Sequence, residues 1–195
     1  MTFTDANACR AEGEPGEATT MKRYVDRTVF KKGTGPNGRQ VCRWCGEETK
    51  PPRRTWCSKA CVDEYLSRSS SRSIRRLVFE RDKGICTSCG LDTEKLSRIL
   101  AHARRSQQSW NDRFIYYCRA IAPLRVQLGF NPSGTLWEAD HITPVIEGGG
   151  QCGLENLRTL CTPCHKQATA ELARRRARQR RDAKRGLLEV MADGM

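Results

Sequence analysis

The cysteines constrain the fold of this chain more than any other feature, because eight of the eleven fall into four close pairs. The pairs are Cys42 with Cys45, Cys57 with Cys61, Cys86 with Cys89, and Cys161 with Cys164. Each pair can present two sulfurs from one tight turn, and tetrahedral zinc takes four such ligands. The odd total and the clustering favour zinc sites in a reducing compartment over a disulfide framework. Zinc also suits a chain with only 37% hydrophobic residues, which is short of apolar side chains for one large core.

The first two pairs form a complete ligand set of their own. Their spacing is C-x2-C-x11-C-x3-C, so a four-cysteine zinc knuckle is predicted over residues 39–70. Val62, Tyr65 and Leu66 follow the last of these cysteines at helical spacing and predict a short helix. The third pair has no complement nearby, and its natural partner is the fourth pair, more than seventy residues further along the chain.

Helices are predicted on both sides of the third cysteine pair. Ile74, Leu77 and Val78 mark one face of a helix that ends at Gly84, while arginines occupy its other faces and suit either DNA or solvent. A helical insertion is predicted over residues 91–130.

The insertion is interpreted as two helices with apolar stripes of the core type. The stripes are Leu96, Ile99, Leu100 and Ala103 in the first helix, and Trp110, Phe114, Tyr117, Cys118 and Ile121 in the second. Because Cys118 lies on the second stripe, we expect its thiol to be buried as a small hydrophobe and not to bind metal. His102 has no chemical partner nearby, so it is expected to be a surface or packing residue.

The two ends of the chain carry no clear periodicity. Residues 1–38 are rich in Gly, Pro, Thr and mixed charge and are expected to form a disordered tail or linker, with Cys9 as a free surface thiol. Residues 186–195 are expected to form a second tail. The N-terminus has no apolar run typical of a signal peptide, and no stretch is apolar enough to span a membrane.

The charge balance points to a polyanionic partner. The 35 basic and 22 acidic residues give a formal charge of +13, and Lys and Arg that neutralise phosphates release condensed counterions. Solubility alone is the alternative explanation, and the clustering of the arginines argues against it. The run from Lys166 to Arg185 holds nine basic and two acidic residues, a net charge of +7. Such a run is typical of an arm that follows the phosphates of a nucleic acid, or of a disordered basic tail.

The stretch that begins WEADHITPV and ends CTPCHK is dense in metal-binding and proton-transfer groups. It is interpreted as a strand ending at Asp140 and His141, a returning strand from Asn156, and a helix opened by His165. Asp140 offers an oxygen ligand and His165 an imidazole for a divalent ion. A histidine has an ordinary pKa of roughly 6.5, so His141 can deprotonate water near neutral pH. The amide of Asn156 can pin a loop or orient that base.

Strand alternation limits how this stretch can form one site. Adjacent strand residues point to opposite faces, so Asp140 and His141 share a site only if the strand ends or bulges there, which Pro144 allows. A structural alternative places both residues in a third zinc site with His165 and a cysteine such as Cys152.

Together these motifs resemble a known family. ADHITPV, the glycines after it, ENLRTLC and CTPCHK resemble the HNH endonuclease motif of the ββα-metal nucleases, in the branch with paired C-x2-C knuckles. TWCSKAC, EYLSRSS and IRRLVFERDKGICTSCG are similar to the C-terminal HNH nuclease modules of annealing helicases that carry a Ran-binding-type zinc finger. The resemblance covers roughly residues 40–180 and does not include a helicase motor.

The resemblance implies an α+β fold. We expect a small zinc-stapled ββα-metal HNH core with additional helices and an N-terminal zinc knuckle. The nuclease domain would span residues 71–185, with the helical insertion and a basic C-terminal helix.

The resemblance also implies roles for the site residues. Asp140 and His165 would bind the catalytic ion, His141 would be the general base, and Asn156 would orient it. One structural zinc would be held by Cys86, Cys89, Cys161 and Cys164, and a second by Cys42, Cys45, Cys57 and Cys61. Only two protein ligands are evident for the catalytic ion, so water and phosphate oxygens would complete its shell, as is usual for Mg²⁺; Mg²⁺ or Mn²⁺ is therefore expected.

The implied function is that of a metal-dependent HNH endonuclease that hydrolyses DNA phosphodiester bonds. The alternative is a catalytically inactive, zinc-stapled module that binds nucleic acid or acts as a scaffold. One HNH centre cuts one strand, so a double-strand cut requires a homodimer, a second encounter or repositioning. Without a helicase motor, we expect a bacterial or phage protein that acts on DNA in the cytoplasm, or a nuclear protein if it is eukaryotic.

Overall fold

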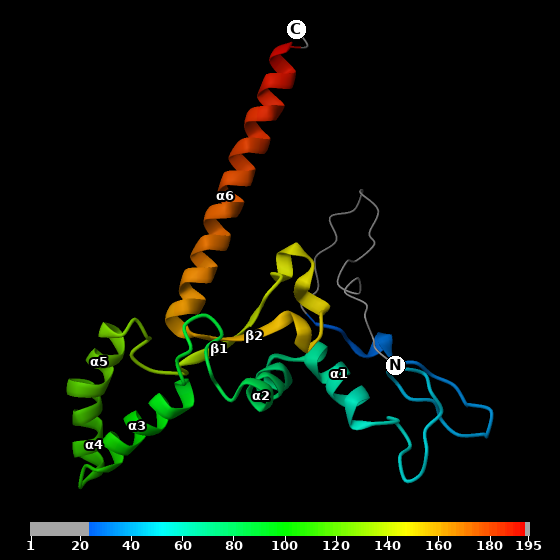
Figure 1. The fold of residues 1–195 in the computed structure, drawn as a ribbon, viewed down its shortest axis with the longest axis horizontal. Coiled ribbons are helices and arrows are strands. Elements are labelled where there is room, and N and C mark those ends of the chain that lie inside the picture. Colours follow the sequence, from blue (N-terminus) through cyan, green and yellow to red (C-terminus); the bar gives the residue numbers. More distant parts are fainter. Residues whose placement is uncertain (1–23, 194–195) are drawn as a thin grey trace. The chain divides into compact units, whose positions relative to one another are not determined.

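A computed structural model describes residues 24–193, so Cys9 lies outside the described residues (Figure 1). Its helices and two-stranded sheet confirm the predicted α+β class. The α-helices are α1 (Lys59–Ser69), α2 (Ser71–Asp82), α3 (Thr93–Arg105), α4 (Trp110–Tyr116), α5 (Ala122–Gln127) and α6 (Thr162–Asp193), and the strands are β1 (Trp137–His141) and β2 (Leu157–Cys161). The short 3₁₀ helices are η1 (Arg27–Val29), η3 (Val145–Glu147), η4 (Gly149–Gln151) and η5 (Leu154–Asn156), and η2 (Tyr117–Ile121) is a π-helix. In the described part of the chain, no helix is long and apolar enough to cross a membrane.

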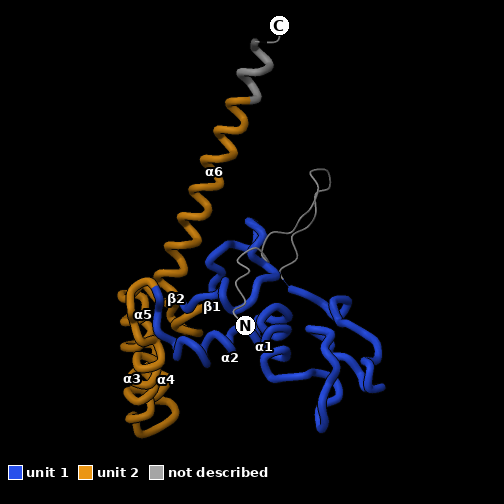
Figure 2. Tube along the Cα trace, turned by 45° about the vertical axis from the view of Figure 1, so that its right-hand side comes forward, with its two compact units in different colours: residues 1–87, 139–159 blue, residues 88–138, 160–195 orange. Residues whose placement is uncertain are grey.

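The chain divides into two compact units, and each is made of two separate segments (Figure 2). Residues 1–87 and 139–159 form the first unit, and residues 88–138 and 160–195 form the second. The first unit therefore holds α1, α2 and the loop between the strands, whereas the second holds the helical insertion and α6.

Aromatic rings form a small core beside the first cysteine set. The Phe30 ring lies 5.6 Å from Trp56 and 4.9 Å from Tyr65 between centroids. Tyr65, on α1, also lies 6.5 Å from Trp44 and 5.6 Å from Trp56. This cluster joins residues before, within and after the cysteine set, so the predicted short helix packs on the knuckle.

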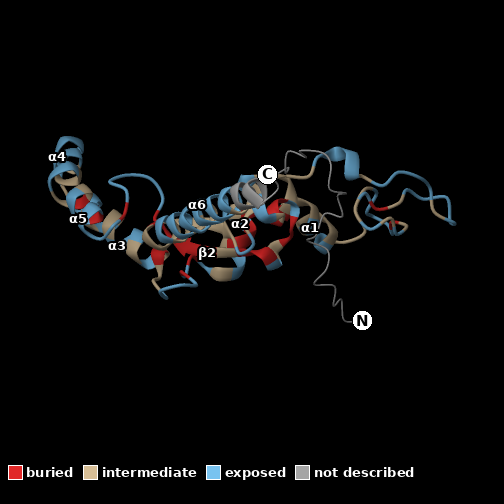
Figure 3. Ribbon diagram, turned by 90° about the horizontal axis from the view of Figure 1, so that it is seen from above, coloured by how far each residue is buried: buried red, intermediate tan, exposed pale blue. Residues whose placement is uncertain are grey.

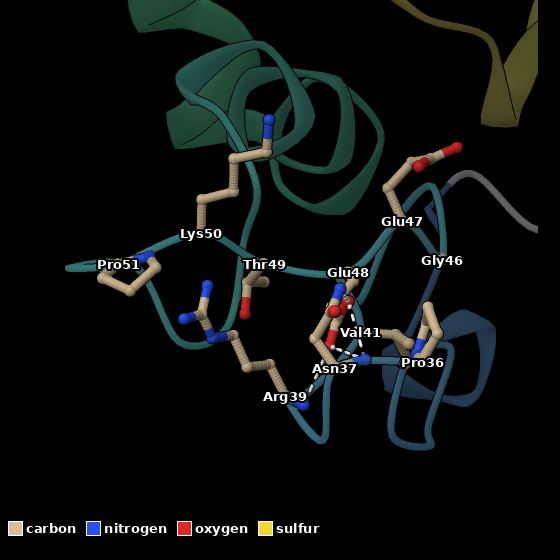
Figure 4. Close-up of a pocket in the computed structure, with 11 residues that line it drawn as sticks. Pro36, Asn37, Arg39, Val41, Gly46, Glu47, Glu48, Thr49, Lys50 and Pro51 are labelled. Carbon is tan, nitrogen blue, oxygen red and sulfur yellow. Dashed lines mark hydrogen bonds between the residues drawn. The ribbon is translucent and has the colours of Figure 1, made fainter.

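Glu48 organises the turns on the outer side of the knuckle (Figure 4). Its carboxylate accepts hydrogen bonds from the Asn37 amide nitrogen Nδ2 at 2.7 Å and from the Arg39 backbone N–H at 2.9 Å. Desolvation raises the pKa of Glu48, but these hydrogen bonds outweigh it and lower the pKa below its ordinary value. The pocket in Figure 4, of about 610 Å³, is therefore built around a carboxylate that shapes the loop itself.

Helix α2 buries the face that its sequence predicts. Ile74, Leu77 and Val78 are 5%, 4% and 0% exposed, and Figure 3 shows buried residues on α2. The helix stops where predicted, because Lys83 adopts the left-handed conformation at φ 54° and Gly84 follows at φ 78°.

The end of α2 is tied to β2 and to the turn before it. The Arg81 guanidinium donates to the backbone carbonyls of Leu154 and Leu157 at 2.6 and 2.7 Å. Asp82 accepts from Arg81 Nε at 2.6 Å and from the Thr159 hydroxyl at 2.8 Å. The hydrogen bonds from Arg81 lower the pKa of Asp82, and the bond from Thr159 adds to this effect. Burial acts in the opposite direction but is outweighed. These bonds hold the C-terminal end of α2 beside Leu157 and Thr159 of β2.

The helical insertion differs from the sequence prediction at several positions. The first predicted helix forms as α3, but the second does not end before Pro123, because α4, η2 and α5 follow one another without a break to Gln127. Ile99, Trp110 and Phe114 are 55%, 72% and 55% exposed. The prediction that Cys118 is buried is wrong, because this cysteine is exposed. An apolar stripe shows which face of a helix is hydrophobic, but not whether another element covers it. Figure 3 shows mostly exposed residues over α4, and burial resumes at Ile121.

Candidate functional site

The two strands form an antiparallel pair whose register is fixed at both ends. At one end the Ile142 amide donates to the Asn156 carbonyl at 2.8 Å, and at the other the Thr162 amide donates to the Leu136 carbonyl at 2.9 Å. Each step forward on β1 is therefore a step backward on β2. The sheet consists of these two strands alone, so its register decides which side chains meet across it.

This register places Arg158 directly opposite Asp140. The Nε and Nη2 atoms of Arg158 lie 3.0 and 2.9 Å from the same oxygen, Oδ2, of the Asp140 carboxylate. The two side chains are 34% and 20% exposed. Two charge-assisted hydrogen bonds fix the direction of a carboxylate better than one. Arg158 is a site residue that sequence reasoning missed.

His141 is the last residue of β1, which meets the condition for sharing a site with Asp140. The chain leaves the strand immediately afterwards through a bend at Ile142 and Thr143. The Nε2 atom of His141 is buried, although the residue as a whole is partly exposed. His141 therefore lies where β1 ends and the chain changes direction.

Asn156 holds the loop that follows His141. Its Oδ1 accepts from the Thr143 backbone N–H at 2.7 Å, and its Nδ2 donates to the carbonyls of Thr143 at 3.1 Å and Gly149 at 3.0 Å. Asn156 is 6% exposed, so these bonds are shielded from water. Of the two roles predicted for this amide, pinning a loop is the one that these contacts perform.

The loop closes so tightly at Gly149 that no side chain fits there. A Cβ atom on Gly149 would lie 1.8 Å from the Thr143 carbonyl oxygen and 2.6 Å from Asn156 Nδ2. The glycine run at residues 148–150 permits either a wide loop or a close backbone approach, and the structure shows close approach at Gly149.

Gly149→Ala is therefore expected to lower the free energy of unfolding by about 1–3 kcal/mol, the usual cost of forcing extra volume into a packed site. The measurement is the thermal melting of the metal-loaded protein. Gly186→Ala is the matched control, because a Cβ there meets nothing within 4 Å. Equal melting temperatures for the two variants would contradict the account of the loop.

His165 lies in the first turn of α6 and follows Cys164 directly. It belongs to the second unit, whereas Asp140, His141 and Asn156 belong to the first. Its side chain is partly exposed. The helix begins at Thr162, so the cysteine pair predicted as a turn spans the last residue of β2 and the first turn of α6.

The cysteines gather into two groups of four, as their spacing predicts. Within each group the sulfur atoms all lie within 4.8 Å of one another. The groups are Cys42, Cys45, Cys57 and Cys61, and Cys86, Cys89, Cys161 and Cys164. Neighbouring sulfurs are 3.4 to 3.7 Å apart, close to the edge of about 3.8 Å expected for a tetrahedron of sulfurs around zinc. Both groups can therefore hold a zinc ion.

Hydrogen bonds support the ligand loops. The Thr87 backbone N–H, next to Cys86, donates to the Thr159 carbonyl on β2 at 2.9 Å, and its hydroxyl donates to the same oxygen at 3.0 Å. This anchors the third cysteine pair to the strand that leads into the fourth. The described residues hold no third group of three or more potential ligands, so the alternative third zinc site with Cys152 finds no support among them.

The thiols of the first group titrate unequally. Burial raises the pKa of Cys42, but backbone hydrogen bonds from Cys57, Trp44 and Cys45 outweigh it and lower the pKa to about 6. Burial raises the pKa of Cys61 to about 12, and the neighbouring thiols add to the shift. Four thiolates this close repel one another, so a cation is needed to stabilise the group fully ionised.

Comparison with known proteins points to one family. A family model described as HNH endonuclease matches residues 127–171. The mouse protein "DNA annealing helicase and endonuclease ZRANB3" is 35% identical over 180 residues, which cover 85% of this chain and 16% of that protein. Its human counterpart is 33% identical over 161 residues, covering 75% and 14%. The chain thus spans less than a fifth of these relatives.

A solved structure agrees at the level of sequence. The crystal structure of the human ZRANB3 HNH domain matches this chain with 36% sequence identity and a TM-score of 0.37. The match covers 56% of this chain and 95% of the chain in that structure. At this TM-score the likeness is one of sequence. The matched residues 127–171 contain the Asp140–His141 pair, Asn156 and the last cysteine pair. The chain therefore belongs to the HNH endonuclease family.

Proposed function

We propose that this protein is a metal-dependent endonuclease that hydrolyses phosphodiester bonds in DNA. The observation that carries the proposal is the arrangement at the end of β1. Asp140 and His141 stand side by side in the chain where the strand stops, and the amide of Asn156 pins the loop that follows. A ligand oxygen and a base held on a rigid turn are what metal-assisted hydrolysis requires.

Asp140 and His165 would be the protein ligands of the catalytic ion. A bound Mg²⁺ or Mn²⁺ would stabilise the negative charge that develops on the phosphate and on the leaving oxygen. Arg158 would keep the Asp140 carboxylate in one orientation through its two hydrogen bonds. A carboxylate and one imidazole form a sparse ligand set, which suits an ion that keeps water and phosphate oxygens in its shell.

His141 would accept the proton of the attacking water. The imidazole of a histidine is mostly neutral near pH 7, so it can act as a base there. Its backbone is held by the strand on one side and by the loop that Asn156 anchors on the other. A base that keeps its position before the substrate arrives avoids the cost of ordering it during the reaction.

The two cysteine groups would hold structural zinc. Each offers four sulfurs and leaves no open ligand position, which is the pattern of a structural site and not a catalytic one. One group would brace the strand and helix that carry the site, and the other would brace the knuckle with its aromatic core.

The competing function is a module that binds nucleic acid without cutting it. The formal charge of +13 and the basic surface of α6 suit such a module equally well. The test is incubation with supercoiled plasmid, with and without Mg²⁺ or Mn²⁺. Conversion to nicked or linear DNA only with the divalent ion supports the nuclease. A plasmid that is retarded on a gel but stays supercoiled under every condition supports the binding module.

A further inference from the structure

Helix α6 continues far beyond the site, and its exposed part is strongly basic. Residues 166–185 contain neither glycine nor proline, and Ala, Arg, Gln, Lys and Glu dominate them. These residue types favour helix even without packing. Figure 1 shows α6 as one continuous helix, so the basic run is an ordered arm and the alternative of a disordered tail does not hold for this segment.

The basic residues on α6 fall on two different faces. At about 100° per residue, Arg176, Arg180 and Lys184 lie about 20°, 60° and 100° from His165 around the helix axis, in one i, i+4 row that turns slowly around the helix. They lie about 16, 22 and 28 Å along the axis from His165. Arg180 and Lys184 are exposed and Arg176 is partly exposed.

The opposite face is also basic but is partly neutralised. Arg174, Arg178 and Arg185 lie on it, and Asp182 is 3.9 Å from Arg178 and 3.5 Å from Arg185. Within the described residues, no ion pair involves the three residues of the row that begins near His165. The positive charge on that row is therefore available to a partner.

We propose that the face of α6 that carries His165, Arg176, Arg180 and Lys184 is a contact surface for duplex DNA. The proposal rests on the proposed function, because it takes His165 as a ligand at the cut site. Each strand of duplex DNA presents a phosphate about every 3.4 Å along the axis. With α6 lying along the duplex axis, the row reaches phosphates roughly 5 to 8 base pairs from the phosphate at His165. Its role is to hold the flanking duplex through charge, without reading its sequence.

The test compares two triple variants that remove the same charge from the same helix. One is Arg176→Gln, Arg180→Gln and Lys184→Gln, and the control is Arg174→Gln, Arg178→Gln and Arg185→Gln. Glutamine keeps helix propensity, and circular dichroism checks that both variants fold. Binding of a labelled 40-base-pair duplex is followed by fluorescence anisotropy over a range of salt concentrations, with no divalent ion added, so that no cutting occurs.

The slope of log Kd against log salt concentration should fall by about 3 for the first variant, since each lost phosphate contact lowers it by about 0.9. It should change by less than about 1 for the control. Equal changes in the two variants would overturn the proposal, because charge alone and not the face would then matter. An unchanged slope in the first variant would also overturn it. A face-specific change in a protein that never cuts DNA would instead refute only the nuclease function.

Discussion

Replacing His141 with alanine is expected to slow DNA cleavage by about 10²–10⁴-fold, the usual contribution of a positioned general base. The reason is that no other described side chain of the β1 end offers an imidazole to the attacking water. Binding to DNA should be unchanged, because the basic surfaces lie elsewhere on the chain. The measurement is the initial rate of plasmid nicking beside an anisotropy titration with an uncut duplex.

The chain provides its own control for this experiment. It has three histidines, and His102 lies exposed on α3 without a proposed role. His102→Ala should cut DNA at the parental rate. Full activity in the His141→Ala variant would show that another group, or metal-bound hydroxide alone, activates the water.

Removing zinc is expected to unfold much of the chain. Structural zinc in small modules binds with about 10–16 kcal/mol at neutral pH, which matches or exceeds the whole stability of a typical domain. The knuckle depends on its cysteine group because its local core is a few aromatic rings. Circular dichroism and thermal melting after chelation should show a large loss of helix, and added zinc should restore it.

Single cysteine variants separate this effect from general thiol chemistry. Cys161 is buried in one of the groups, so Cys161→Ser should lose one zinc and lower the melting temperature sharply. Cys118 is exposed and belongs to neither group, so Cys118→Ser should behave like the parent. Unchanged dichroism and melting after verified loss of both zinc ions would refute the structural role.

Much of the fold follows from spacing that allows few solutions. Cysteine pairs two or three residues apart must turn tightly, and a pair without a local complement must find a distant one, so the union of Cys86 and Cys89 with Cys161 and Cys164 was predictable. The face of α2 was predictable for a similar reason, because Ile74, Leu77 and Val78 can be buried together only in a helix.

Other features depend on contacts that local sequence does not encode. Fifteen residues separate the two strands, so the register that brings Arg158 to Asp140 could not be counted from a short turn. Exposure of Cys118 depends on whether anything packs over its helix. The close approach at Gly149 could not be predicted from the glycine run alone, because glycine permits both a wide loop and close packing of the backbone.

The most direct test of the central claim is the rate of plasmid nicking as a function of Mn²⁺ concentration, in the parent and in His165→Ala. The parent should show no nicking without a divalent ion, and its rate should saturate as Mn²⁺ is added. The His165→Ala curve should need at least about tenfold more Mn²⁺ to reach half its maximum, because the ion has lost one of two protein ligands. Nicking by the parent in the absence of any divalent ion, or identical curves for the two proteins, would contradict it.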